Sequence, residues 1–188
     1  FAHKTCDELL SRTSLPIGAE GWFAIPRWQL VASTYNEAVH YVLGILDATL
    51  RGAFVNRRKG RIGPSQLRES KKKMTAFQIL SERQGGNDIL VVPAQFGARH
   101  QGQSARRADA VMTPLECSLG AFEVAVMLLT HPKRLMALDP WVDCTGDEYS
   151  FRGKFRPLFH FGGGKLQFDM KAEQEPSEKS GTASVFIT

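Results

Sequence analysis

The apolar run from Leu119 to Leu129 constrains the fold of this chain more than any other feature, because Glu123 is its one charged residue. The run is too short to span a membrane, which takes about 18 or more apolar residues. A helix that is apolar nearly all round is buried inside a domain. The preceding Thr113-Pro114-Leu115-Glu116 is typical of a helix start, because proline fits the first helical position. The sequence therefore predicts a buried central helix over about residues 114–129.

Three further helices are predicted from local signals. Thr34 and Glu37 fit a capping box, in which each side chain satisfies a free backbone donor of the other residue, and apolar residues recur at helical spacing up to residue 51. Another helix is predicted over residues 65–84, where Gly85-Gly86 would end an apolar stripe. Ser104 is a favourable cap for a short helix up to residue 112.

Strands are predicted in the remaining apolar segments. The β-branched run Ile89–Val92 is typical of a buried strand, and Gly162-Gly163-Gly164 is typical of a hairpin turn between two aromatic-rich runs. We therefore expect a single α+β domain over residues 1–188, with a small, mostly antiparallel C-terminal sheet. Residues 1–33 are expected to form an extended arm, and residues 171–181 a mobile loop.

The three cysteines, Cys6, Cys117 and Cys144, are far apart and match neither a CxxC pair nor a zinc-binding spacing. Free thiols in a reducing compartment are the simplest interpretation, and they favour a cytoplasmic location. Cys144 would act as a nucleophile only beside a histidine, which the sequence does not place there. No membrane partner is predicted, since no apolar run is long enough to cross a bilayer.

Positive charge is concentrated in the middle of the chain. From Arg51 to Arg107, 57 residues carry 13 Lys or Arg and 3 acids, whereas the other 131 residues carry 11 Lys or Arg and 16 acids. Such a field favours a polyanionic partner, because each phosphate that is contacted releases condensed counterions. The split predicts binding to the phosphate backbone of nucleic acid, either DNA or RNA.

The first group of candidate phosphate contacts lies in a loop and in the helix that follows it. Arginines can bind a phosphate with two hydrogen bonds, and lysines act as point charges. Few aromatic residues accompany this group, so backbone or duplex binding is favoured over stacking of single-stranded bases. The alternative is a solvated surface, or pairing with the acidic C-terminal segment. The residues are Arg57, Arg58, Lys59, Arg61, Lys71, Lys72 and Lys73.

The second group lies in the polar loop after the predicted strand. Its donors are Arg99, His100, Ser104, Arg106 and Arg107. Backbone N–H groups in a glycine-bearing loop before a helix favour an anion. The loop matches neither the phosphate-loop pattern nor the dinucleotide-binding glycine pattern. A structural loop whose arginines pair with acids elsewhere is the alternative.

An enzyme that acts on a phosphate-bearing substrate is a second hypothesis for the function. In this hypothesis the Arg99–Arg107 loop clamps the phosphate and His100 serves as acid or base, with His100 and Arg99 as the candidate catalytic residues. Asp143, Asp147 and Glu148 would hold a divalent metal through oxygen ligands, and no other cofactor is predicted. The alternative for these three acids is ion pairing with the basic loops.

A protein–protein interaction module is a third hypothesis. It would use the aromatic segment Gly21–Trp28, which either packs across the domain or exposes a partner surface. The leading interpretation remains a nucleic-acid-binding protein, because the charge asymmetry is the strongest signal in the sequence.

Five segments together resemble an uncharacterised family of bacterial proteins. The resemblance covers about residues 20–188 and implies a bacterial, intracellular origin. The family has no established activity, cofactor or site, so it assigns no role to any residue here. The segments are Gly21-Trp22-Phe23-Ala24-Ile25-Pro26-Arg27-Trp28, Asp88–Phe96, Arg99–Arg107, Leu119–Pro132 and Asp143-Cys144-Thr145-Gly146-Asp147-Glu148.

Overall fold

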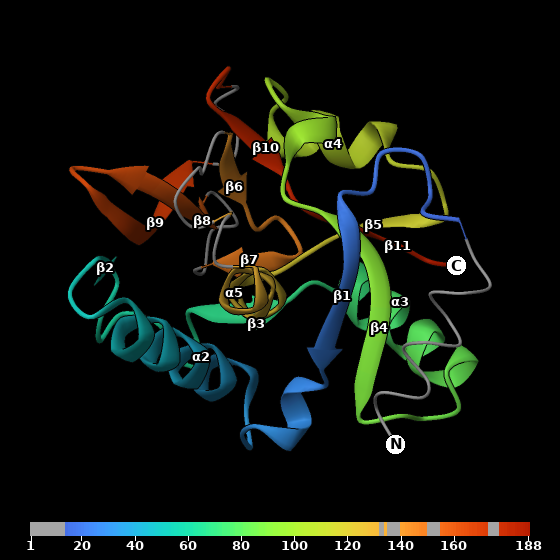
Figure 1. Cartoon of the computed structure of the whole chain (residues 1–188), viewed down its shortest axis with the longest axis horizontal. Helices are drawn as coiled ribbons and strands as arrows, with labels where there is room; N and C mark the ends of the chain where they lie inside the picture. The colour runs from blue at the N-terminus through green and yellow to red at the C-terminus, as the bar shows by residue number, and fades with distance from the viewer. Residues whose placement is uncertain (1–13, 132–133, 135–139, 150–154, 173–176) are drawn as a thin grey trace.

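The protein mixes helices with two β-sheets, which confirms the α+β class. In Figure 1, helix α5 (Ala121–Thr130) is seen end-on near the centre, between α2 (Tyr35–Leu50) and the strands β1 (Gly21–Pro26) and β4 (Ile89–Gln95). No helix in the described part of the chain is long and apolar enough to cross a membrane. The computed structural model describes residues 14–131, 134, 140–149, 155–172 and 177–188.

The first sheet has four antiparallel strands in the order β1, β4, β11 (Ser184–Phe186) and β5 (Glu116–Ser118). The predicted strand Ile89–Val92 is the first part of β4. Six of the seven β4 residues are buried, as expected for a strand inside a sheet.

The second sheet has seven strands among the described residues and is larger than predicted. It combines the predicted β8–β9 hairpin with strands from the first half of the chain, because β3 pairs with β7 and β2 pairs in parallel with β9. Gly163 and Gly164 have positive φ angles in the hairpin turn, a conformation that favours glycine. The strands are β2 (Phe54–Asn56), β3 (Leu67–Glu69), β6 (Trp141–Asp143), β7 (Asp147–Tyr149), β8 (Phe155–Gly162), β9 (Lys165–Ala172) and β10 (Ser180–Thr182).

Two segments expected to lie outside the regular structure are partly strands. Residues 21–26 of the expected arm pair with β4 along their whole length, from Gly21 opposite Ala94 to Pro26 opposite Ile89. The expected loop over residues 171–181 begins in β9 and ends in β10, with residues 173–176 outside the described part. In both segments, backbone pairing with another strand supplies the order that local sequence did not indicate.

The helices begin after residues that cap them. Thr34 N donates to Glu37 Oε2 at 3.1 Å, which is one half of the capping box predicted for α2. The other half is not formed, because the buried Thr34 hydroxyl has no hydrogen-bond partner among the described residues. Ser104 caps α4 (Ala105–Val111), also as predicted. Helix α3 (Lys71–Arg83) is capped by Ser70, whose hydroxyl accepts from Lys73 N at 3.2 Å.

Two predicted helix starts were wrong for one physical reason. The expected starts near residues 65 and 114 fall before short strands, because Leu67 pairs with Tyr149 in β7 and Cys117 pairs with Val185 in β11. The helices α3 and α5 begin only after those strands. Residues 121–128 of α5 are all buried, as expected for a central helix.

Candidate functional site

At the junction between β3 and α3, neighbouring side chains point either to the surface or into the core. The strand ends at Glu69, Ser70 caps the helix, and three lysines follow in its first turn. Successive helical residues are rotated by about 100°. Lys71 and Lys72 are therefore exposed, whereas Lys73 points into the core and is 0% exposed. Three surface hollows lie around this junction.

Two of the hollows adjoin, since Ser70, Lys72 and Glu148 line both of them. Their volumes are about 280 and 800 Å³. We call the pair the basic hollow. It brings Lys72 of α3 and Arg106 of α4 into one lining, although they come from separate segments of the sequence. Its basic side chains are Arg68, Lys71, Lys72, Arg106 and Arg156, and its acidic side chains are Glu69, Asp109, Asp147 and Glu148.

Two of the basic side chains form ion pairs at the rim of the basic hollow. Lys72 Nζ lies 2.6 Å from Asp109 Oδ1, and Arg68 Nη2 lies 2.6 Å from Glu148 Oε2. All four side chains are substantially exposed. Exposed pairs of this kind contribute little to stability, so a stronger anion can replace either acid.

Arg156 pairs with the buried Asp143 at 2.9 Å, but two other cations at the hollow have no acidic partner within the described residues. Lys71 and Arg106 are exposed and form no ion pair there. Arg107 is exposed beside Arg106 on α4. These side chains can bind an anion without first breaking an ion pair.

The first basic loop lies elsewhere. Arg57 and Arg58 each donate to a side chain of β9, and the Arg58–Asp169 distance is 2.8 Å. Lys59 and Arg61 are exposed in the turn that follows β2. None of the four lines the basic hollow.

Lys73 corrects the expectation that all three consecutive lysines face a phosphate. Its ammonium is buried at 3.0 Å from Asp147, 2.9 Å from Glu123 and 3.3 Å from Glu69. It also donates to Tyr35 Oη at 2.8 Å. We call these five residues the Lys73 cluster. A buried cation is tolerated only when such partners compensate for its lost hydration.

The Lys73 cluster contains three carboxylates and one ammonium. Burial lowers the pKa of Lys73, but the carboxylates outweigh burial and raise that pKa above its ordinary value. Burial raises the pKa of Glu69 and of Asp147, against the attraction of Lys73. Lys73 therefore stays charged, and Glu69 and Asp147 are carboxyl groups that take up a proton more readily than usual.

The backbone at the start of α5 completes the cluster. Ala121 N donates to Asp147 Oδ2 at 2.7 Å, and Gly120 N donates to Glu123 Oε2 at 3.0 Å. A β-carbon at residue 120 would collide with the Asp147 carboxylate and the Lys73 ammonium. Glycine is therefore required at this position by close packing.

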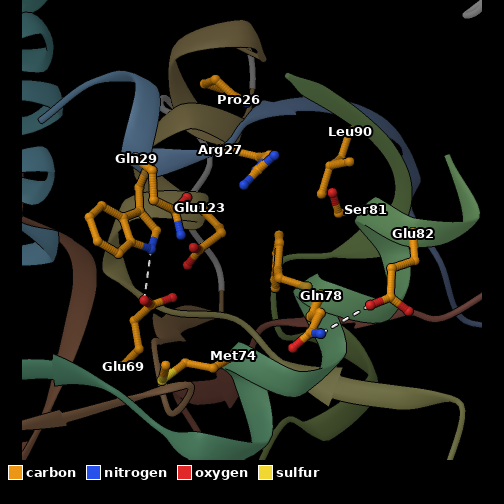
Figure 2. Close-up of a pocket in the computed structure, with 12 residues that line it drawn as sticks. Pro26, Arg27, Gln29, Glu69, Met74, Gln78, Ser81, Glu82, Leu90 and Glu123 are labelled. Carbon is orange, nitrogen blue, oxygen red and sulfur yellow. Dashed lines mark hydrogen bonds between the residues drawn. The ribbon is translucent and has the colours of Figure 1, made fainter. Parts of the chain in front are cut away.

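The third hollow opens beside the cluster and has a volume of about 310 Å³. Figure 2 shows Glu69 and Glu123 on one side of it and Gln78 and Glu82 of α3 on the other. The Trp28 indole lines it and donates from Nε1 to Glu69 Oε2 at 2.7 Å. We call this the Trp28 hollow. It follows that Glu69 faces both the buried ammonium and a surface opening.

The predicted loop 99–107 is anchored by an acid of β5. His100 Nε2 lies 2.8 Å from Glu116 Oε1, and Arg99 Nε lies 3.2 Å from Glu116 Oε2. Burial would raise the pKa of Glu116, but hydrogen bonds from His100 and Ser184 hold it below its ordinary value. His100 and Arg99, the candidates for catalysis, line none of the three hollows.

The three acids considered as metal ligands are bound to different basic side chains. Asp143 pairs with Arg156 at 2.9 Å, Asp147 belongs to the Lys73 cluster, and Glu148 pairs with Arg68. Within the described residues, no group of His, Cys, Asp or Glu side chains is placed to hold a metal ion. All three acids are ion-paired, as in the alternative, but their partners lie in β8, α3 and β3 and not in the basic loops.

The two cysteines in the described part of the chain are buried. Cys117 and Cys144 are buried free thiols, and Cys6 lies outside the described residues. Burial raises the pKa of Cys117 to about 11 and that of Cys144 well above its ordinary value. Burial disfavours the thiolate form of both residues, so neither has the environment of a reactive cysteine.

Four residues at the junction were missed at the level of sequence: Trp28, Tyr35, Glu69 and Glu123. The available signal was Glu123, because an acid inside a nearly all-apolar helix needs a buried cation. The sequence does not say which of 24 Lys and Arg residues supplies it.

No family model, curated protein or solved structure matches the chain. This agrees with the resemblance to a family that has no established function. The function is therefore inferred from the geometry alone.

Proposed function

We propose that the protein binds nucleic acid by contacting the phosphate backbone at the basic hollow. The observation that carries the proposal is that two separate helices bring Lys72 and Arg106 into the lining of one depression, with Lys71 in the lining of the adjoining one. Clustered Lys and Arg side chains on one face are the electrostatic footprint of a phosphate-binding surface.

The rim ion pairs support reversible binding. Asp109 and Glu148 neutralise Lys72 and Arg68 in the free protein, and both pairs are exposed. A phosphate that displaces an exposed acid gains a charge-assisted hydrogen bond at little cost. Contacts to phosphate carry no base information, so we expect weak dependence on sequence.

Fluorescence anisotropy with short DNA and RNA duplexes and single strands tests this proposal. The single variants Lys71→Glu and Arg106→Glu are each expected to weaken binding by about tenfold, which corresponds to about 1.4 kcal/mol. The matched control is Lys165→Glu, since Lys165 is exposed at the β8–β9 turn and lines none of the hollows.

Two outcomes would contradict the proposal. Equal weakening by all three variants would show that net charge, and not the basic hollow, governs binding. Absence of binding by the wild-type protein at low salt would remove the proposal altogether.

No specific observation favours the metal-dependent enzyme of the sequence hypothesis. Its three candidate ligands bind different basic side chains, and its candidate acid or base, His100, is held by Glu116 away from the hollows. The interaction module is likewise not favoured, because residues 21–26 pair with β4.

A further inference from the structure

The Trp28 hollow and the basic hollow are direct neighbours. Glu69 and Met74 line both of them, so the two depressions meet along the first turns of α3. Their charges differ. The lining of the Trp28 hollow contains Glu69, Glu82 and Glu123 but a single cation, Arg27. The lining of the basic hollow contains five cations and four acids. A phosphate is therefore favoured at the basic hollow over the Trp28 hollow.

The Trp28 hollow has a rigid aromatic wall. The indole of Trp28 is held by its hydrogen bond to Glu69 and by an edge-to-face contact with Tyr35, with 5.8 Å between ring centroids. Met74 and Phe77 of α3 add apolar surface to the lining. A flat ring can stack on this indole at little entropic cost, because the indole is already held in place before binding.

Polar groups suited to the edge of a heterocycle surround this wall. Gln29 and Gln78 offer amide donors and acceptors, and Figure 2 shows Gln78 across the hollow from Glu69. The Gln78 amide donates to Glu82 at 3.0 Å on the exposed surface of α3, where it is free to exchange partners. The carboxylate of Glu69, which faces the hollow, can accept a hydrogen bond from an amino group.

We propose that the Trp28 hollow receives a single unstacked base of a nucleic-acid strand whose phosphates lie in the basic hollow. The inference rests on the proposed function and narrows its ligand to single strands or flipped-out bases. Single strands are commonly bound by a basic groove for the backbone together with an aromatic side chain for each stacked base. Trp28 supplies the aromatic group that the basic segments lack in the sequence.

Two matched single strands separate the contribution of the base in the Trp28 hollow from that of the phosphates in the basic hollow. One strand carries bases, and the other is an abasic strand of equal length with the same phosphates. The wild-type protein is expected to bind the base-bearing strand about tenfold more tightly, in line with the contribution of one stacked base. Trp28→Ala should abolish this ratio and leave binding of the abasic strand unchanged, whereas Trp28→Phe should keep most of the ratio.

A second variant covers the case in which Trp28→Ala fails to fold, as judged by circular dichroism. Gln78 is exposed on α3, so Gln78→Ala is expected to fold and to lower the ratio by several-fold. The change should appear for the base-bearing strand alone.

The outcomes distinguish this inference from the proposed function. A wild-type ratio near one, or a ratio that survives both Trp28→Ala and Gln78→Ala, overturns the base pocket and leaves backbone binding intact. Binding of neither strand overturns the proposed function as well.

Discussion

Lys72 and Lys73 are adjacent in the sequence but contribute to the protein in different ways. Lys72 is exposed and forms a rim ion pair, whereas Lys73 is surrounded by three carboxylates and Tyr35. We expect Lys73→Met to lower the free energy of unfolding by about 3–5 kcal/mol, because it leaves buried charges without a counterion. Lys72→Met should change it by about 0.5 kcal/mol or less. Urea unfolding of both variants measures the difference, and equal effects would contradict the role of the Lys73 cluster.

Glu69 is expected to make the free energy of unfolding fall as pH rises. Burial raises the pKa of its carboxyl group in the folded state, so the folded protein retains a proton that the unfolded chain releases as pH rises. The wild-type protein therefore loses stability relative to Glu69→Gln as pH rises above the ordinary carboxyl pKa. Urea unfolding of both proteins across the acid range measures the difference in their free energies of unfolding. A difference that does not change with pH would contradict the prediction.

At the residue scale, local signals predicted contacts near in sequence and missed those far apart. The Glu37 half of the Thr34–Glu37 capping box was predicted correctly, because its two partners are three residues apart. The Lys73 cluster could not be predicted, since its members come from β3, α2, α3, α5 and β7. The run Lys71-Lys72-Lys73 offers no sign of which lysine turns inward until the face of α3 that packs on the core is known.

At the scale of elements, Ser70 ends β3 and caps α3, which fixes the direction of the helix that carries Lys71 and Lys72. Ser70→Ala should lower the free energy of unfolding by about 1 kcal/mol, the usual cost of losing a helix cap. Ser65→Ala is the control, because Ser65 is exposed and caps no helix. If Ser70→Ala were as stable as this control, the Ser70 cap would not stabilise the start of α3.

Elements were predicted well where their signal is local. The helix α2, the strand β4, the β8–β9 hairpin and the cap of α4 follow from caps, β-branched runs and glycine turns. The starts of α3 and α5 were not predictable, because β3 and β5 form only by pairing with strands far along the chain. A three-residue strand carries too little pattern to compete with a helix signal beside it.

At the scale of the whole molecule, the charge asymmetry of the sequence is divided among distinct places. Part of it lines the basic hollow, part lies on the turn beside β9, and Lys73 is buried. Composition could indicate a polyanionic partner but not this division, because the two sheets determine which basic residues come together. The Trp28 hollow was not predicted for the same reason, since its lining combines η1 (Trp28–Leu30) with α3 and α5.

The salt dependence of binding tests the central claim most directly. Anisotropy measurements with one DNA strand across a salt series give the slope of log K against log salt, which counts the phosphates that the protein contacts. We predict a steep negative slope for the wild-type protein, and a slope reduced by about one in magnitude for Arg106→Glu. A flat slope, or a slope that Arg106→Glu leaves unchanged while Lys165→Glu reduces it, would contradict phosphate binding at the basic hollow.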